Sequence, residues 1–257
     1  DLENPDRVLI GGEDNKSIGK LVSIYKNWVS TNKIITTNLW SSELSKLIAN
    51  AFLAQRVSSI NSVASLCEAT GANVNEVAMA VGLDSRIGKN FLNPGPGFGG
   101  SCFKKDILNL VYLCNHFGIP EVGAYWENVL KLNNWHQEKI VRTIVNKLFG
   151  TLTGKKIIIL GFAFKANTND TRESPAIFVV NHLLNEGANL IIHDPKVTKD
   201  QIENDLSSFQ RKNKNEKISS SSLESIGTWS FSSDLTNVFD NAHAVIILTE
   251  WKDYSIL

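Results

Sequence analysis

The sequence lacks several features that mark whole classes of proteins. It has only three cysteines, an odd number without metal-ligand spacing, which argues against a disulfide scaffold and suits a reducing compartment such as the cytoplasm. Its longest apolar runs, IIILGFAF and AVIILT, are far below the roughly 18 residues that a membrane span needs. The 26 basic and 26 acidic residues cancel, so no excess charge favours nucleic acid or a membrane surface. Small molecules therefore become the expected partners.

The chain has enough apolar sequence for a sizeable core. With 257 residues and 42% hydrophobic content, it is long enough to divide into domains. No methionine precedes DLENPDRVLIGG, so we expect the chain to belong to a longer one. Residues 1–38 predict a short strand, a helix at about 16–29 and a strand in KIITTN. These are typical of the closing units of an α/β domain whose beginning is absent.

Residues 39–150 are expected to be all-helical. A long helix is predicted from Trp40 to Ala69, with Ser41 or Ser42 as its N-cap and Gly71 as its stop. Further helices are predicted at 73–82, 102–117 and 121–148. The apolar stripe of the long helix is predicted to pass through Leu44, Leu47, Ala51, Val57, Ile60, Ala64 and Cys67.

Residues 151–257 predict part of a doubly wound sheet. KKIIILGFAFK, a helix at about 174–187 and NLIIHDP form a β-α-β unit, and a helix near 234–240 and the strand AHAVIILTE continue the sheet. The centre of residues 200–230, rich in Ser, Asn and Lys, is interpreted as a mobile surface insertion. The expected fold class is therefore α/β, with a helical centre and a final sheet that stops before it is complete.

Residues 93–106, NPGPGFGGSCFKKD, contain four glycines, two prolines and a cysteine. Gly95, Gly97 and Gly100 match G-x-G-x-x-G, but a dinucleotide fingerprint requires a buried strand immediately before it and an acid about 20 residues later, after a second strand. GKNFLNP precedes these glycines and a predicted helix occupies the later position, so the fingerprint interpretation fails. The glycines instead predict an open loop whose backbone can approach a ligand closely, stiffened by its two prolines.

Cys102 falls in the first turn of the following helix. Free N–H groups, the helix dipole and the neighbouring Lys104 and Lys105 are expected to stabilise a thiolate and to lower the pKa of this cysteine. Cys102 and Asp106 stand one turn apart, off the apolar stripe. Most cysteines are inert small hydrophobes, but this environment favours a nucleophile. The stripe itself is predicted to contain Phe103, Ile107, Leu110, Val111 and Cys114, and Cys67 is also expected in the core.

Two further patterns each allow a functional and an ordinary interpretation. Lys46 and Asn50 stand at i and i+4 on the long helix, where they either stabilise an oxyanion or form a solvated helix face. GFAFKANTNDTRES begins where the strand KIIIL ends. Because open parallel sheets bind ligands at the carboxyl ends of their strands, Gly161, Lys165 and Arg172 favour a nucleotide site over a plain turn with surface charges.

With these residues in view, the chain resembles the UDP-glucose 6-dehydrogenases of the eukaryotic type. The resemblance rests on long motifs spread over the whole sequence: NPDRVLIGG, WSSELSKLIANAFLAQR, SSINS, LCEATGANVNEVA, GFGGSCFKKDILNLVYLC, PEVGAYW, GFAFKANTNDTRES and AHAVIILTEW. It implies the end of an NAD-binding Rossmann domain at 1–38, a central helical dimerisation region at 39–150 and a Rossmann-like UDP-binding domain at 151–257. It also implies a cytoplasmic homodimer or higher homo-oligomer.

The resemblance further implies an activity, the four-electron oxidation of UDP-glucose to UDP-glucuronate with NAD. Cys102 would form a thiohemiacetal and then a thioester, Lys46 and Asn50 would hold the reacting oxygen, and Asp106 would orient or activate water. Arg86 would reach the sugar bound by a neighbouring subunit, and Arg172 would act on the cofactor side. The remaining substrate contacts implied are Phe91, Leu92, Phe98, Gly99, Phe164 and Lys165.

Three alternatives remain beside this hypothesis. Another nucleotide-sugar dehydrogenase, such as one for GDP-mannose, would need the same cysteine, lysine and aspartate. A non-catalytic dimerisation or UDP-sugar-binding module is a second, because no Rossmann fingerprint is present; we expect little or no turnover from this chain alone. A cysteine hydrolase would need a histidine partner for Cys102, and no histidine lies in a motif beside it.

Overall fold

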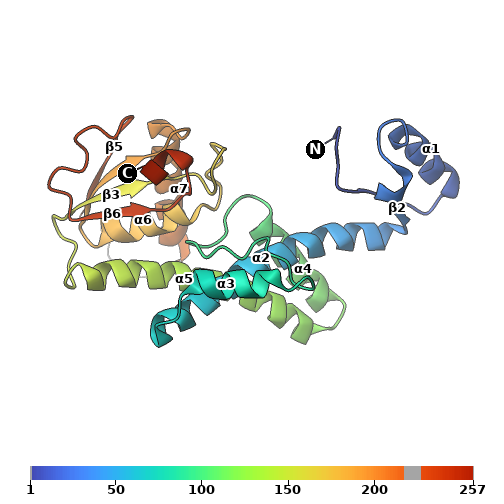
Figure 1. Cartoon of the computed structure of the whole chain (residues 1–257), viewed down its shortest axis with the longest axis horizontal. Helices are drawn as coiled ribbons and strands as arrows, with labels where there is room; N and C mark the ends of the chain where they lie inside the picture. Colours follow the sequence, from blue (N-terminus) through green and yellow to red (C-terminus); the bar gives the residue numbers. More distant parts are fainter. Residues whose placement is uncertain (1, 217–226, 257) are drawn as a thin grey trace.

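The computed structural model describes residues 2–216 and 227–256. Its elements form three groups along the chain: a small α/β unit at one end of a long helix, helices packed around that helix, and a second α/β unit that contains the C-terminus (Figure 1). The predicted fold class is confirmed. In the described part of the chain no helix is long and apolar enough to cross a membrane.

The first α/β unit is a parallel pair of short strands with a helix between them. β1 (Val8–Gly11) pairs with β2 (Ile34–Thr37), while α1 (Asn15–Tyr25) and the short helix η1 (Thr31–Lys33) connect them. The side chain of Asp14 caps α1 by accepting hydrogen bonds from two of its first N–H groups. The strands predicted here are both confirmed, and their small core contains Val8, Ile10 and Val29.

The long helix α2 (Leu39–Thr70) begins earlier than its predicted cap. Asn38 is the N-cap, and its Oδ1 accepts a hydrogen bond from the Ser41 N–H at 2.8 Å. The predicted cap at Ser41 or Ser42 is therefore wrong, because Asn38 satisfies the free N–H groups one turn earlier. At the other end, Gly71 stops the helix in the left-handed region at φ 79°, as predicted.

Three more helices complete the central group: α3 (Val74–Leu83), α4 (Phe103–His116) and α5 (Pro120–Lys147). Small residues on α2 allow α4 and α5 to approach it closely, since Ala51 and Ala54 are fully buried. The predicted stripe of α2 is only partly confirmed, because Leu44, Leu47 and Val57 are half-buried. The shared core consists of Ala51, Ala54, Phe98, Ile107, Leu110, Cys114, Trp126 and Val129.

The second α/β unit contains a four-stranded parallel sheet with the order β5-β4-β3-β6. The strands are β3 (Lys156–Leu160), β4 (Asn189–His193), β5 (Thr228–Phe231) and β6 (Ala244–Ile247), accompanied by α6 (Pro175–Asn185) and the short helix η2 (Lys252–Ile256). The apolar run of β3 is buried because it lies between β4 and β6, as central parallel strands require. The predicted β-α-β unit is confirmed.

One prediction for this unit is wrong, and another falls largely outside the described residues. Residues 199–216 form helix α7 (Lys199–Glu216), because Ile202 and Leu206 supply a buried apolar stripe within a polar composition. The centre of residues 200–230, predicted as a mobile insertion, includes residues 217–226, which lie outside the described part, and β5 follows at residue 228. The helix predicted near 234–240 is a series of turns, since Asn237 adopts a left-handed conformation with φ 59°.

Candidate active site

Lys46, Asn50 and Asp106 converge from two helices. Lys46 Nζ lies 3.1 Å from Asp106 Oδ2, and Asn50 Nδ2 donates to the same oxygen at 2.5 Å. Asp106 is only 2% exposed, whereas the Lys46 side chain is 64% exposed. The packing of α2 against α4 therefore turns two separate helical patterns into one charged group with an open side.

The Asp106 carboxyl is ionised despite its burial. Desolvation by itself would raise the pKa of Asp106, but hydrogen bonds from Asn50 and Lys46 and the positive charges of Lys46 and Lys105 outweigh it. The pKa of Asp106 is therefore lowered below its ordinary value. The group presents a stable negative charge that holds a lysine and an amide in place.

Cys102 is the N-cap residue of α4 and is exposed. Its carbonyl oxygen accepts the first intrahelical hydrogen bond, from the Asp106 N–H at 2.8 Å, and its Sγ lies 3.6 Å from Ser101 Oγ. Cys67 and Cys114 are buried, as predicted. The only exposed cysteine of the chain thus stands one turn before Asp106, at a helix end with free N–H groups.

The loop that precedes α4, residues 93–102, ends at Cys102 and is here called the cysteine loop. Three side chains from α2 and α5 hold its backbone: Asn61 Oδ1 accepts from the Gly95 N–H at 3.0 Å, His136 Nε2 lies 2.9 Å from the Gly95 carbonyl oxygen, and Asn133 Oδ1 accepts from the Phe98 N–H at 2.9 Å. Burial lowers the pKa of His136, which favours the neutral ring at this contact.

No local sequence pattern singles out these three anchors. Asn61, Asn133 and His136 are at most 7% exposed, although polar residues on helices are usually solvated. The available signal is weak: Asn61 directly follows the buried Ile60 on the apolar face of α2. His136 therefore has a structural contact in the cysteine loop, at the Gly95 carbonyl group.

A second loop, residues 161–174 between β3 and α6, is here called the strand-end loop. Asp194, at the end of β4, accepts hydrogen bonds at Oδ2 from the backbone N–H groups of Phe162 and Ala163 and from Trp251 Nε1. Its Oδ1 accepts from two further N–H groups, those of Lys196 and Val197. One buried carboxylate therefore fixes the start of the loop that carries Phe164 and Lys165.

The two loops touch, and the cysteine loop needs glycine to do so. The Gly100 N–H donates to the Arg172 carbonyl oxygen at 2.8 Å, and a methyl group at Gly99 would overlap the Glu173 carbonyl oxygen. Two residues beyond Cys102, Lys104 Nζ forms an ion pair with Glu173 Oε2 at 2.8 Å. The predicted close backbone approach therefore serves, at Gly99 and Gly100, to pack one loop against the other.

The predicted substrate residues fall into exposed and buried groups. Phe91 is 46% exposed and has a left-handed φ of 60°, and Lys165 lies over the Phe164 ring at 5.3 Å. Leu92 and Phe98 are each only 8% exposed, and Phe98 packs edge-on against Phe103. Leu92 and Phe98 therefore support the loops more than they face solvent.

Two predicted arginines have acidic partners two residues before them. Arg86 pairs with Asp84 at 2.6 Å and Arg172 pairs with Asp170 at 2.7 Å, both with exposed guanidinium groups. The bond to Asp170 and its charge, with a smaller contribution from Cys102, raise the pKa of Arg172. Arg172 is therefore within electrostatic reach of Cys102, whereas Arg86 is held by Asp84 on the segment after α3.

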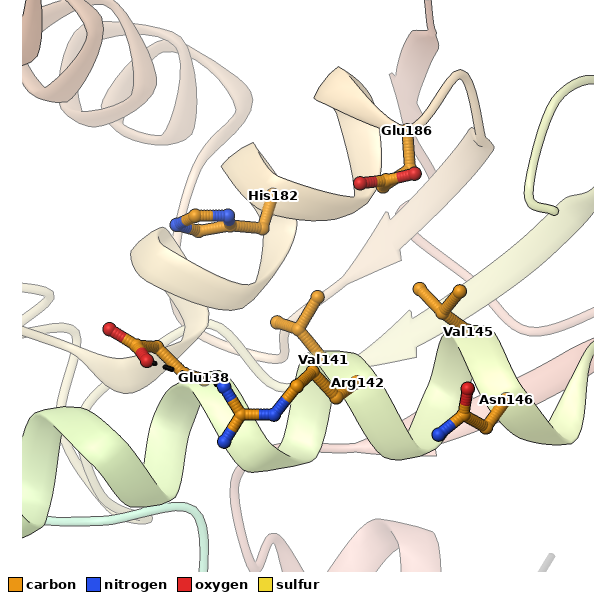
Figure 2. Close-up of a pocket in the computed structure, with 7 residues that line it drawn as sticks. All are labelled: Glu138, Val141, Arg142, Val145, Asn146, His182 and Glu186. Carbon is orange, nitrogen blue, oxygen red and sulfur yellow. Dashed lines mark hydrogen bonds and ion pairs between the residues drawn. The ribbon is translucent and has the colours of Figure 1, made fainter. Parts of the chain in front are cut away.

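A cavity of about 400 Å³ lies elsewhere, between α5 and α6 (Figure 2). Val141 and Val145 point from α5 toward α6, while Glu138 and Arg142 form a 3.4 Å ion pair at its edge. None of the predicted site residues lines this cavity. The chemistry of the cysteine loop is therefore separate from it. Within residues 2–216 and 227–256, no group of three or more His, Cys, Asp or Glu side chains is arranged to hold a metal ion.

Comparison with curated proteins gives strong matches over the full chain. The chain is 54% identical over 258 residues to the UDP-glucose 6-dehydrogenase of Caenorhabditis elegans, covering 99% of this chain and 52% of that protein. It is also 54% identical to the UDP-glucose 6-dehydrogenase of Gallus gallus, covering 100% of this chain and 51% of the relative. The chain thus spans about half the length of these relatives.

Solved structures and family models agree with these matches. A UDP-glucose dehydrogenase from Pyrobaculum islandicum superposes with a TM-score of 0.83 at 32% identity, covering 99% of this chain and 53% of that one. Residues 40–135 match the central domain of the UDP-glucose/GDP-mannose dehydrogenase family. Residues 158–257 match the UDP binding domain of the same family. With two models of one family matched over most of its length, the chain belongs to the UDP-glucose/GDP-mannose dehydrogenase family.

Proposed function

We propose that this chain carries the covalent and substrate-binding machinery of a UDP-glucose 6-dehydrogenase, which converts UDP-glucose to UDP-glucuronate. The observation that carries the proposal is the convergence of Lys46, Asn50 and Asp106, one helical turn from the exposed Cys102. Relatives with 54% identity over the whole chain bear this name.

In the proposed reaction, Cys102 reacts with C6 of the substrate after C6 has been oxidised to an aldehyde. The thiolate sulfur forms a bond to the aldehyde carbon, the carbonyl π electrons move to the oxygen, and the thiohemiacetal results as its oxyanion. The Lys46 ammonium and the Asn50 amide, both oriented by Asp106, are the donors that would stabilise the negative oxygen. Their attachment to one buried carboxylate holds them in place before the charge develops.

Asp106 would act when water releases the product. After C6 of the thiohemiacetal loses a hydride to the acceptor, it is a thioester. A water oxygen then bonds to C6, the carbon–sulfur bond breaks, the sulfur leaves as thiolate and the protons of the water pass to the solvent. Because the pKa of Asp106 is lowered, its carboxylate is a weak base at neutral pH. We therefore assign it the orientation of water, Lys46 and Asn50 rather than full proton removal.

Oxidation of an alcohol to a carboxylate withdraws four electrons, and we propose that two NAD molecules accept them, two electrons each. The described residues do not fit a dinucleotide by themselves. Asp14 already caps the first turn of α1, and Asp194 occupies the N–H groups at the end of β3, where the pyrophosphate of a dinucleotide would bind. Among the described residues, Arg172 is the predicted contributor to the dinucleotide site, and the rest of that site has to come from residues other than those described.

The proposed UDP-glucose site lies where the two loops meet. Phe164 and Lys165 extend from the strand-end loop, and the Lys165 charge is available to a phosphate. Gly99 brings the cysteine loop against Glu173 beside them, and Phe91 offers an exposed aromatic face. Leu92 and Phe98 would form the apolar floor beneath these contacts.

We also propose that the protein is a cytoplasmic homodimer joined through its central helices. Large apolar side chains are exposed there, a pattern typical of interaction surfaces. Sedimentation of the protein at several concentrations tests the association. A strictly monomeric protein at all concentrations would contradict it and would leave Arg86 no neighbouring site to reach. The exposed residues in question are Phe52 (53%), Leu66 (64%), Met79 (64%), Leu83 (80%) and Tyr112 (65%).

Titration calorimetry and cysteine alkylation together test the proposed function. We expect UDP-glucose to bind, and to protect Cys102 from iodoacetamide while GDP-mannose does not; Cys67 and Cys114 serve as buried internal controls. An Asp106→Asn variant should keep the fold but lower the turnover of any active form by about 10²-fold, because its donors lose their anionic anchor. If UDP-glucose neither binds nor protects, the proposal fails for this chain; binding of UDP-glucose that leaves Cys102 freely alkylated would identify a binding module.

A further inference from the structure

Arg56 on α2 binds three backbone carbonyl groups of one short segment. Its Nε donates to the Asn90 carbonyl oxygen at 2.8 Å, its Nη1 to that of Ile87 at 2.9 Å, and its Nη2 to that of Gly88 at 2.6 Å. The planar guanidinium presents its donors in a rigid fork, so one side chain can satisfy three acceptors that a lysine could not reach together.

The segment that Arg56 holds, residues 87–90, has no helix or strand of its own. It follows the end of α3 at Leu83, and Gly88 adopts a left-handed φ of 71°. Its carbonyl groups are not used in a regular ladder, so a charged donor from outside is an effective way to order them. Without the fork, the backbone between α3 and the cysteine loop has fewer fixed points.

Both ends of this segment lead to predicted substrate contacts: Phe91 in the site of the same subunit, and Arg86 toward the sugar bound by a neighbouring subunit. Arg86 stands one residue before it, fixed through Asp84, and Phe91 stands one residue after it with a strained φ of 60°. The fork therefore lies between two predicted substrate contacts. A left-handed phenylalanine persists only when its neighbours determine its backbone, which the Asn90 contact does directly.

α2 also carries Lys46 and Asn50, ten and six residues before Arg56. At 1.5 Å per residue, Arg56 lies about 15 Å along the helix axis from Lys46. One rigid helix therefore sets both the oxygen-binding pair and the anchor of the 87–90 segment. A shift of this segment against α2 would change the distance between the predicted sugar contacts and the reacting atoms.

We propose that Arg56 is a positioning residue for nucleotide-sugar recognition, acting through Phe91 and Arg86. This inference rests on the proposed function. Arg56 itself makes no contact with the reacting groups in this arrangement; its effect passes through the three carbonyl bonds. The cysteine loop is held by Asn61, Asn133 and His136 instead, so the intrinsic reactivity of Cys102 is independent of the fork.

The test compares Arg56→Lys and Arg56→Gln with Arg142→Lys, a control at an exposed i,i+4 ion pair on α5. We expect Arg56→Lys to weaken UDP-glucose binding about tenfold, since losing the fork removes charge-assisted bonds. The rate of Cys102 alkylation without ligand should stay within about twofold of the wild type, because its loop has separate anchors. Arg142→Lys should change neither quantity.

A double-mutant cycle with Phe91→Ala separates positioning from general stabilisation. If Arg56 acts through Phe91, the two losses in affinity overlap. The double variant then binds UDP-glucose about as weakly as the single variant of lower affinity. Fully additive losses, unchanged affinity in Arg56→Lys, or a parallel change in ligand-free Cys102 alkylation would overturn the inference. If Arg56→Gln does not fold, Arg56→Lys alone decides by the same criteria. Absence of UDP-glucose binding by the wild type would instead show that the proposed function has failed, and the inference with it.

Discussion

The cysteine loop and the strand-end loop are positioned in different ways. Neutral side chains from two helices hold the cysteine loop, each at one residue of its backbone. The strand-end loop is fixed by the buried carboxylate of Asp194, which accepts five hydrogen bonds, and by Ser174 and Thr249, which donate to the Phe162 and Ala163 carbonyl groups.

The two loops also differ in how many polar atoms of their anchoring side chains have hydrogen-bond partners. Asn61 Nδ2 and His136 Nδ1 are buried without a hydrogen-bond partner within residues 2–216 and 227–256. Unpaired buried polar atoms cost free energy, so the cysteine loop is held less firmly than a loop whose anchors are fully paired. The anchors of the strand-end loop are thus the more completely paired, and the cysteine loop, which carries the candidate nucleophile, has the less completely paired anchors.

The largest effect should come from removing the carboxylate that anchors the strand-end loop. We expect Asp194→Ala to lower the free energy of unfolding by about 3 kcal/mol or more, because it leaves several buried N–H groups without an acceptor. Urea unfolding followed by circular dichroism measures this change. Asp240→Asn, an exposed position of the same unit, is the control. A loss below about 1 kcal/mol would show that Asp194 does not dominate this loop.

Asp194 also shows what the sequence could and could not reveal. An acid at the end of the second strand was visible in NLIIHDP, and in a dinucleotide-binding unit that position contacts a ribose. Here the carboxylate caps the protein's own backbone. The two uses share one sequence pattern, so only the three-dimensional path of the strand-end loop distinguishes them.

The members of the candidate catalytic group were predictable from the sequence, and their geometry only in part. Helical spacing paired Lys46 with Asn50 and Cys102 with Asp106, because residues four apart share a helix face. The joining of the two pairs depends on the packing of α2 against α4, across 60 residues of sequence between Lys46 and Asp106. No local pattern encodes such a contact, and the same holds for Asn61 and His136 under the cysteine loop.

The contact between the two loops offers the next test. We expect Gly99→Ala to destabilise the protein by about 1–3 kcal/mol and to weaken UDP-glucose binding, since its methyl group would overlap the Glu173 carbonyl oxygen. Gly95→Ala is the matched control in the same loop, because a methyl group there meets no atom within 4 Å. Thermal unfolding and calorimetry give the two quantities. Equal effects of both substitutions would mean that the contact at Glu173 contributes neither to stability nor to UDP-glucose binding.

The smallest expected effect is a pH dependence confined to the cysteine loop. Burial lowers the pKa of His136 in the folded protein, so below the ordinary histidine pKa of about 6.5 the unfolded chain binds a proton that the folded chain resists. The stabilising contribution of the neutral ring is therefore fully present above that pH and is lost as the pH falls from there toward the lowered pKa. His136→Gln keeps a donor for the Gly95 carbonyl and does not titrate.

Thermal unfolding of both proteins between pH 7.5 and pH 5 checks this prediction. His193 also has a pKa lowered by burial, so both proteins should lose stability on acidification, and the wild type should lose more by the contribution of His136. The ligand-free alkylation rate of Cys102 should diverge over the same interval, because a charge on the buried His136 ring costs free energy that opening of the cysteine loop relieves. Parallel unfolding curves and parallel alkylation rates would show that the unpaired Nδ1 of His136 does not weaken this loop, and the contrast between the two loops would then rest on Asn61 alone.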